Sequence, residues 1–207
     1  MTKVFPNIGA SNASRPGYDG EKEEVLTVWR KSLLFNCSGF TVFDKKGNLV
    51  FRVDNYASGN KGEVVLMDAA GKSLLTIRRK KLSLGDHWLV FAGEESVNPL
   101  FSVKKPVNFL NSRLLAQLTV GGGSWRGQSS SRQPAYAIEG SYSQRSCVVY
   151  DDKRRPMAEI RRKEAVGGVA FGQDVFRLVV QPELDAAFAM ALVILLEQMF
   201  GSRRASS

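Results

Sequence analysis

The sequence has 207 residues, of which 43% are hydrophobic, enough to form one sizeable domain or a large single barrel. Its formal net charge of +9 favours acidic partners, so nucleic acid, an anionic membrane surface and acidic proteins all qualify. The alternative is a soluble surface that is basic without a specific partner. Cys37 and Cys147 lie far apart without metal-binding or redox spacing, which predicts free thiols in a reducing compartment.

Residues 1–24 predict a disordered tail. The segment is rich in small, polar and turn-forming residues and lacks the apolar run of a secretory signal. Residues 202–207 have the same polar character, so we expect a second disordered tail there.

The chain between the tails predicts about twelve short strands. β-branched and aromatic residues recur in short runs that often alternate with polar ones, and Gly, Asn, Asp, Ser and Pro separate the runs. The expected strands cover residues 25–30, 40–44, 48–54, 63–68, 73–79, 87–91, 100–105, 114–120, 135–140, 147–152, 157–163 and 174–180. Residues 105–115 read as a loop or a short helix, and the glycine-rich segment from residue 121 reads as a flexible hairpin loop.

A weak internal repeat indicates that one hairpin unit recurs. The copies are VFDKKGNLVFRVDN (42–55), LMDAAGKSLLTIRRKK (66–81) and VYDDKRRPMAEIRRKE (149–164). Each copy ends a strand on an aspartate, namely Asp44, Asp68 and Asp151, which we interpret as turn formers and not as catalytic groups. Two copies have glycine three residues later, where a tight turn needs positive φ, and Arg154 takes that place in the third. Pro156 suggests an edge position or an irregular turn.

Residues 185–201 predict one buried helix. Residues 186–196 are all apolar, and Ala, Leu and Met favour helix. Pro182 and Glu183 suit a first turn, so we expect the helix over residues 183–200. A helix that is apolar all round lies in a membrane or inside a protein. Residues 185–200 span about 24 Å, which is shorter than the ~30 Å hydrocarbon core, and this favours a core helix over a tail anchor.

The hairpins and the helix together predict the fold class. A sheet of about twelve antiparallel strands curls shut and so removes its edges, and a barrel of this size leaves a lumen that an apolar helix can fill. We therefore expect a mainly β protein, with a closed antiparallel barrel over residues 25–201 around a central hydrophobic C-terminal helix.

Four basic clusters are the functional signal. They are Arg78, Arg79, Lys80 and Lys81; Lys104 and Lys105; Lys153, Arg154 and Arg155; and Arg161, Arg162 and Lys163. If Ile77 and Ile160 point into the lumen, the next residues, Arg78 and Arg161, face outward. We expect these strands to end one residue later, which puts charge at one rim, and we expect the two equivalent hairpins to bring their clusters close together. The alternative is solvated strand ends that prevent edge pairing.

Several segments resemble the LURP-one-related proteins of plants. They are LLTIRRKKLSLGDHWLVFAG, PLFSVKK, CVVYDDKRRPMAEIRRK and DVFRLVVQPELDAAFAMALVILLEQ, and the resemblance covers about residues 25–200. That family is similar to the tubby C-terminal domain and to phospholipid scramblases, which implies a twelve-stranded barrel around a central helix. It also implies a role in plant defence. In tubby relatives a basic surface binds phosphoinositides, but their lipid-binding motif is not recognisable here.

The resulting functional hypothesis is a non-enzymatic, membrane-tethered factor in defence or stress responses. The expected site for phosphoinositides or other anionic phospholipid headgroups comprises Arg78, Arg79, Lys80, Lys81, Arg154, Arg155, Arg161, Arg162 and Lys163. The alternative is a cytosolic protein-interaction scaffold without lipid affinity. Nucleic acid is the weaker partner because the three tryptophans are not interleaved with basic residues. We expect no transmembrane span and a cytoplasmic location, peripheral at the plasma membrane or nuclear.

Catalytic, metal and cofactor motifs are not recognisable. His87 is the only histidine, it opens a strand, and we interpret it as a surface or cap residue. One histidine and two distant cysteines form no metal-ligand cluster. The GGGSW segment (121–125) lacks the residues of a phosphate-binding loop. We therefore expect no catalytic residues, no metal and no cofactor.

Overall fold

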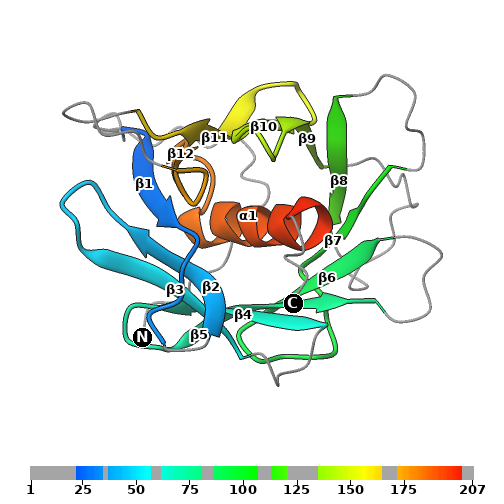
Figure 1. Cartoon of the computed structure of the whole chain (residues 1–207). Helices are drawn as coiled ribbons and strands as arrows, with labels where there is room; N and C mark the ends of the chain where they lie inside the picture. Colours follow the sequence, from blue (N-terminus) through cyan, green and yellow to red (C-terminus); the bar gives the residue numbers. More distant parts are fainter. Residues whose placement is uncertain are drawn as a thin grey trace, which may run out of the picture.

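The computed structural model describes residues 22–34, 37–56, 62–80, 86–106, 113–120, 135–164 and 172–201. These residues form twelve strands and one helix, as the sequence predicts (Figure 1). The strands are β1 (Glu24–Trp29), β2 (Cys37–Phe43), β3 (Leu49–Tyr56), β4 (Glu63–Asp68), β5 (Ser73–Arg79), β6 (His87–Ala92), β7 (Phe101–Lys104), β8 (Leu114–Val120), β9 (Tyr136–Ser141), β10 (Ser146–Asp151), β11 (Pro156–Arg162) and β12 (Val175–Val180), and the helix is α1 (Ala186–Phe200). Most of the predicted N-terminal tail (1–21), the C-terminal tail, residues 107–112, the glycine-rich loop (121–134) and Lys81 lie outside the described residues.

The twelve strands join into one closed antiparallel barrel. Each strand pairs with its neighbours in the chain, and β1 closes the ring against β12, from Glu24 opposite Val180 to Trp29 opposite Val175. Because neighbouring strands are antiparallel, all odd-numbered strands end at one rim of the barrel. We call this the helix-end rim, because α1 ends there. The opposite rim, where β12 ends and α1 begins, is the helix-start rim (Figure 1).

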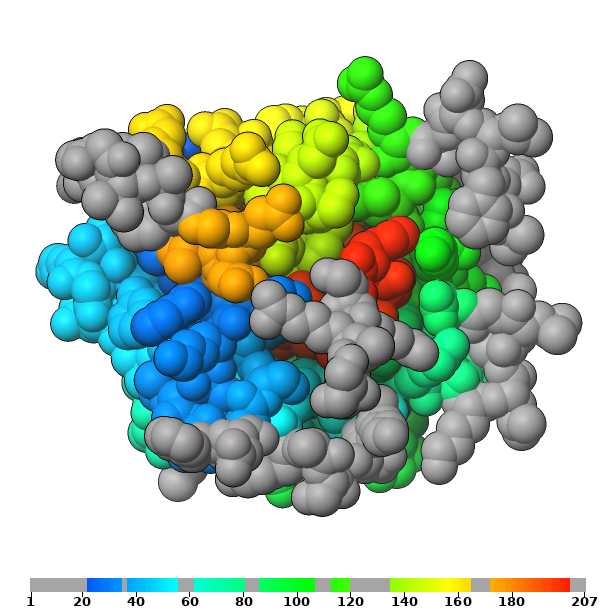
Figure 2. Space-filling view, in the orientation of Figure 1, coloured from blue at the N-terminus to red at the C-terminus, as the bar shows by residue number. Residues whose placement is uncertain are grey.

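Helix α1 fills the lumen of the barrel. Residues 187–196 are all buried, and the ring centroid of Phe188 lies 4.6 Å from that of Phe101 on the wall. In Figure 2 the strands enclose the helix, and only part of its red C-terminal end is visible on this face. Full burial of one large aliphatic side chain stabilises a fold by about 1.5–3 kcal/mol, so wall and helix depend on each other. Among the described residues, no helix is long and apolar enough to cross a membrane.

Helix α1 begins three residues later than the sequence predicts. Asp185 is its N-cap, and the Asp185 carboxylate accepts a hydrogen bond of 2.8 Å from the backbone N–H of Phe188. This bond satisfies one of the N–H groups that a helix start leaves without a partner. Pro182 and Glu183 lie in the turn that joins β12 to the helix. The same two residues suit a turn and a first helical turn, so composition alone placed the boundary too early.

The repeated hairpins form the turns that the sequence predicts. Asp44, Asp68 and Asp151 each accept a hydrogen bond from the backbone N–H four residues later, at 2.8, 2.9 and 2.8 Å. The residue three positions after each aspartate has positive φ: 84° and 89° at the two glycines, and 64° at Arg154. Pro156 begins β11 beside a shift of register between β10 and β11. The predicted edge position is wrong, because the closed ring has no edge. The turn itself matches those of the other two copies, which have a register shift at the equivalent place.

Candidate anion-binding surface

The structure divides the predicted basic site among three places. Arg78, Arg79 and Lys80 lie at the end of β5, Arg161, Arg162 and Lys163 lie at the end of β11, and Arg154 and Arg155 lie in the turn between β10 and β11. Both strands end at the helix-end rim, and Ile77 and Ile160 point into the core, as predicted. The turn between β10 and β11, however, lies at the helix-start rim.

The expected proximity of the two equivalent clusters is wrong. Strands follow one another around the ring in chain order, and β5 and β11 lie half-way round from each other. Figure 1 shows β11 above α1 and β5 below it. Because six strands is the largest separation that a ring of twelve allows, the two equivalent hairpins are as far apart as the barrel permits. The predicted site is therefore not one compact patch.

Five of the predicted arginines are bound to carboxylates. The pairs are Arg78–Glu63 (2.7 Å), Arg79–Asp86 (2.8 Å), Arg154–Glu139 (2.5 Å), Arg155–Asp151 (2.7 Å) and Arg161–Glu159 (2.5 Å). Exposed pairs of this kind contribute little to stability, but they use guanidinium donors and offset local charge. Arg154 also lies over the ring of Tyr150, 4.4 Å from its centroid, which helps to hold this residue in its left-handed conformation. These five side chains are therefore weaker anion ligands than the sequence suggests.

The helix-end rim nevertheless has an excess of cations. Among the described residues, the cations at its strand ends and turns are Arg30, Lys31, Arg79, Lys80, Lys104, Lys105, Arg113, Arg145, Arg162 and Lys163. The acids there are Glu63, Asp86, Glu164, Asp174 and Glu197. Lys80, Lys104, Arg113 and Arg162 are exposed, and no carboxylate of the described residues lies within ion-pair distance of them. Anions near this rim therefore meet the uncompensated charges of Lys80, Lys104 and Arg162. The charge of Arg113 acts on Glu139, whose pKa is lowered by its hydrogen bond from Arg154 and also by Arg113.

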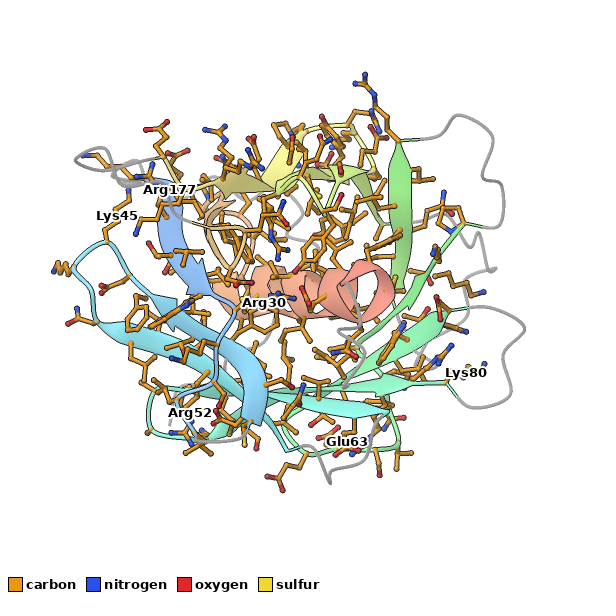
Figure 3. The ribbon with its side chains drawn as sticks, in the orientation of Figure 1. Arg30, Lys45, Arg52, Glu63, Lys80 and Arg177 are labelled. Carbon is orange, nitrogen blue, oxygen red and sulfur yellow. The ribbon has the colours of Figure 1, made fainter. Side chains whose placement is uncertain are left out.

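The helix-start rim has the opposite balance. Its described acids are Glu23, Glu24, Asp44, Asp68, Glu94, Glu95, Asp151, Asp152, Glu183 and Asp185, against Lys22, Lys45, Lys46, Lys72, Lys153, Arg154 and Arg155. In Figure 3, Lys45 and Lys80 mark the two ends of the barrel, on the left and the right. Among the described residues, positive charge is therefore distributed asymmetrically along the barrel axis.

Arg30 and Arg113 are rim residues that the cluster search did not find. Arg113 has no basic neighbour in the sequence, so no run of basic residues includes it. Arg30 and Lys31 form a basic pair like Lys104 and Lys105, which could have marked this position. The signal that could have found them is the direction of the strands. In an up-and-down antiparallel barrel, every residue that follows an odd-numbered strand or precedes an even-numbered one lies at the same rim.

Arg30 links the end of α1 to the barrel wall. Its guanidinium contacts Glu197 of α1 at 2.9 Å and Asp174, which precedes β12, at 2.7 Å. Figure 3 shows Arg30 in front of the helix. Desolvation acts to lower the pKa of Arg30, but the hydrogen bonds that its guanidinium donates to Glu197 and Asp174 raise the pKa overall. Since α1 has no basic residue in its last turn, the wall supplies the cation that its C-terminal dipole favours.

Arg145 forms the buried part of the same contact. Its side chain is only 6% exposed, and its guanidinium lies between the rings of Tyr142 and Phe176, at 4.3 and 4.4 Å from their centroids. The Nε donates to the backbone carbonyl of Gln173 at 3.0 Å, and Tyr142 donates its hydroxyl to Glu197 at 3.0 Å. This packing fixes the helix end in the barrel, so we assign Arg145 a structural role and not ligand binding.

His87 opens β6 at the cationic rim, as the sequence predicts, and it is half-buried there. Burial lowers the pKa of His87, and the charges of Lys104 and Lys80 lower it further. Its imidazole therefore reports the electrostatic potential of this rim. Among the described residues, no group of three or more His, Cys, Asp or Glu side chains could hold a metal ion.

The fold and the charged rim define the class: a closed antiparallel barrel filled by a hydrophobic helix, with a cationic surface around the helix end. Comparison with known proteins gives the family. A profile described as LURP-one-related matches residues 24–197. The chain is 49% identical to Protein LURP-one-related 8 of Arabidopsis thaliana, over 98% of this chain and 100% of that protein. It therefore belongs to the LURP-one-related family, and the resemblance seen in the sequence is confirmed.

Other relatives agree with this assignment. Protein LURP-one-related 12 of Arabidopsis thaliana is 40% identical, over 97% of this chain and 91% of that protein. An X-ray structure of a protein from Arabidopsis thaliana superposes with a TM-score of 0.61 at 24% identity, over 84% of this chain and 90% of that one. This last similarity supports the fold alone.

Proposed function

We propose that this LURP-one-related barrel is a non-enzymatic protein that binds anionic phospholipid headgroups, phosphoinositides among them, through its helix-end rim. Bound in this way, the domain acts as a peripheral membrane tether in defence or stress responses. The observation that carries the proposal is the axial asymmetry of charge among the described residues, with exposed cations outside ion-pair distance of any described carboxylate at one rim and an excess of acids at the other. The role in defence rests on the resemblance to the family.

The asymmetry also orients the domain. Lys80, Lys104, Arg113 and Arg162 project from four different strand ends of one rim, so an anionic surface attracts all four at once when the barrel stands on that end. Each basic residue near such a surface contributes about 1 kcal/mol. The acidic rim then points away from the membrane, where repulsion is smallest. A compact lipid pocket is not required for this mode of binding.

Co-sedimentation with liposomes tests the proposal through two matched quadruple variants. The first changes Lys80, Lys104, Arg113 and Arg162 to alanine, and the second changes Lys45, Lys46, Lys72 and Lys153 at the helix-start rim. All eight side chains are exposed, and both variants lose four charges. We expect the helix-end variant to lose on the order of a thousandfold in affinity. The helix-start variant should bind like the wild type or slightly better.

Lipid composition separates a headgroup site from a basic surface. One vesicle set carries a phosphoinositide. The other set contains enough phosphatidylserine to give it the same surface charge. Stronger binding to the phosphoinositide vesicles supports selectivity for that headgroup, whereas equal binding to both supports general attraction to anionic lipid. Equal losses in the two quadruple variants would contradict the oriented model. Failure of the wild-type protein to bind either set would reject lipid binding in favour of a protein-interaction scaffold.

A further inference from the structure

The segment between β1 and β2 exposes an apolar surface at the helix-end rim. Trp29 is 40% exposed, Leu33 52% and Leu34 38%. Among the described residues, the other exposed large hydrophobic side chain is Val97, which is 81% exposed and lies in the segment between β6 and β7. Single exposed apolar residues are common on protein surfaces, but three within six positions form a patch that suggests an interaction site.

The position of this segment is fixed by hydrogen bonds, so the exposure of the leucines is enforced. Ser32, between the exposed residues, is buried, and its hydroxyl donates to the carboxylate of Asp54 on β3. The same Oγ accepts a hydrogen bond of 3.0 Å from the backbone N–H of Leu34. The backbone carbonyl of Lys31 accepts a bond of 2.6 Å from the hydroxyl of Thr41. With Ser32 held inward, the neighbouring Leu33 is held toward solvent.

The charge around the patch identifies what covers it. The ammonium group of Lys31 lies 5.3 Å from the centroid of the Trp29 ring, and exposed Arg162 lies at the same rim, at the end of β11. Tryptophan, leucine and lysine together suit a bilayer interface, where the indole lies at headgroup level, leucine enters the acyl boundary and lysine meets lipid phosphate. A bilayer satisfies the apolar and the cationic groups of this rim together.

We propose that Trp29, Leu33 and Leu34 form a hydrophobic anchor that inserts into the interface of an anionic bilayer. This inference rests on the proposed membrane binding and adds its mode: charge attracts the rim, and the anchor then holds it. The two contributions are separable because the leucines carry no charge. Replacing Leu33 and Leu34 by serine should lower the affinity for anionic vesicles by about tenfold without changing the surface charge.

An environment-sensitive dye at position 33 tests insertion directly. Cys37→Ser removes the half-buried thiol, and the buried Cys147 stays in place. In this background, Leu33→Cys and Val97→Cys are each labelled with NBD, so position 97 provides an exposed apolar control in the segment between β6 and β7. With phosphatidylserine-containing vesicles we expect NBD at position 33 to brighten, shift to shorter wavelength and become accessible to quenchers in the lipid phase. NBD at position 97 should not change.

The outcomes distinguish this inference from the proposed function. The wild-type protein could bind vesicles while NBD at position 33 stays in water and the serine variant binds normally. That result would reject the hydrophobic anchor and leave electrostatic binding through the helix-end rim. If neither labelled protein nor wild type binds, both proposals fail. Equal changes at positions 33 and 97 would contradict directed insertion. A concentration-dependent change at position 33 without vesicles would assign the patch to contact between copies of the chain.

Discussion

At the scale of single residues, His87 is the reporter of the cationic rim. Its pKa is lowered by burial and then by Lys104 and Lys80. We predict that changing both lysines to alanine raises the pKa of His87 part of the way towards its ordinary value near 6.5, since burial remains. Because the chain has one histidine, NMR titration of its imidazole resonance measures this without assignment. An unchanged pKa would mean that the lysine ammonium groups lie farther away in solution.

The same shift gives the sign of a stability effect. The folded pKa of His87 lies below its unfolded value, so the unfolded chain binds the proton first as pH falls. The contribution of His87 to stability is therefore complete above the unfolded pKa and is lost as pH falls through the folded one. Vesicle-bound headgroups near Lys80 and Lys104 act in the opposite direction to these lysines, so lipid binding should also raise the pKa of His87.

At the scale of elements, α1 is the core that the wall packs against. Leu192 lies in the lumen and is 1% exposed. We predict that Leu192→Ala lowers the free energy of unfolding by about 2–5 kcal/mol, because the closed ring cannot contract to fill the cavity. Urea denaturation measures the change. Asp185→Ala is the matched change at the helix start and should cost about 1 kcal/mol, since it removes only the N-cap bond.

The outcome for Leu192 separates two descriptions of the barrel. A loss for Leu192→Ala no larger than that for Asp185→Ala would mean that the wall is stable with a partly filled lumen. A loss of several kcal/mol would mean that the helix and the wall fold as one cooperative unit.

The elements were largely predictable from sequence, and the site was not. Alternation of β-branched and polar residues located every strand to within a few residues, because packing between two surfaces selects that pattern. It also gave the outward direction of Arg78 and Arg161. Alternation of residue types contains no information on how far apart two strands lie around the ring. The separation of β5 from β11 follows only from the strand pairing in the structure. Contacts such as Arg79 with Asp86 depend on turn geometry that residue types do not determine.

At the scale of the whole molecule, two physical forces act at one rim. Attraction between exposed charges weakens with salt, since the Debye length falls from about 10 Å at 0.1 M to about 3 Å at 1 M. Burial of Trp29, Leu33 and Leu34 does not weaken in this way. We predict that wild-type protein, once bound to anionic vesicles, remains partly bound at high salt, whereas Leu33→Ser/Leu34→Ser dissociates. Flotation of vesicles across a salt series measures the bound fraction of both proteins. The same salt dependence for the wild type and the variant would contradict binding by charge and hydrophobic insertion together.

The position of α1 in the chain has a consequence for biosynthesis. All twelve strands precede the helix, and β1 meets its partner only when β12 has been made. A nascent chain on the ribosome therefore carries eleven strands with apolar inner faces before either the closing strand or the core exists. Long-range closure of this kind is slow, and exposed strand edges favour aggregation. Synthesis of this domain should therefore depend on chaperones until its last helix is released.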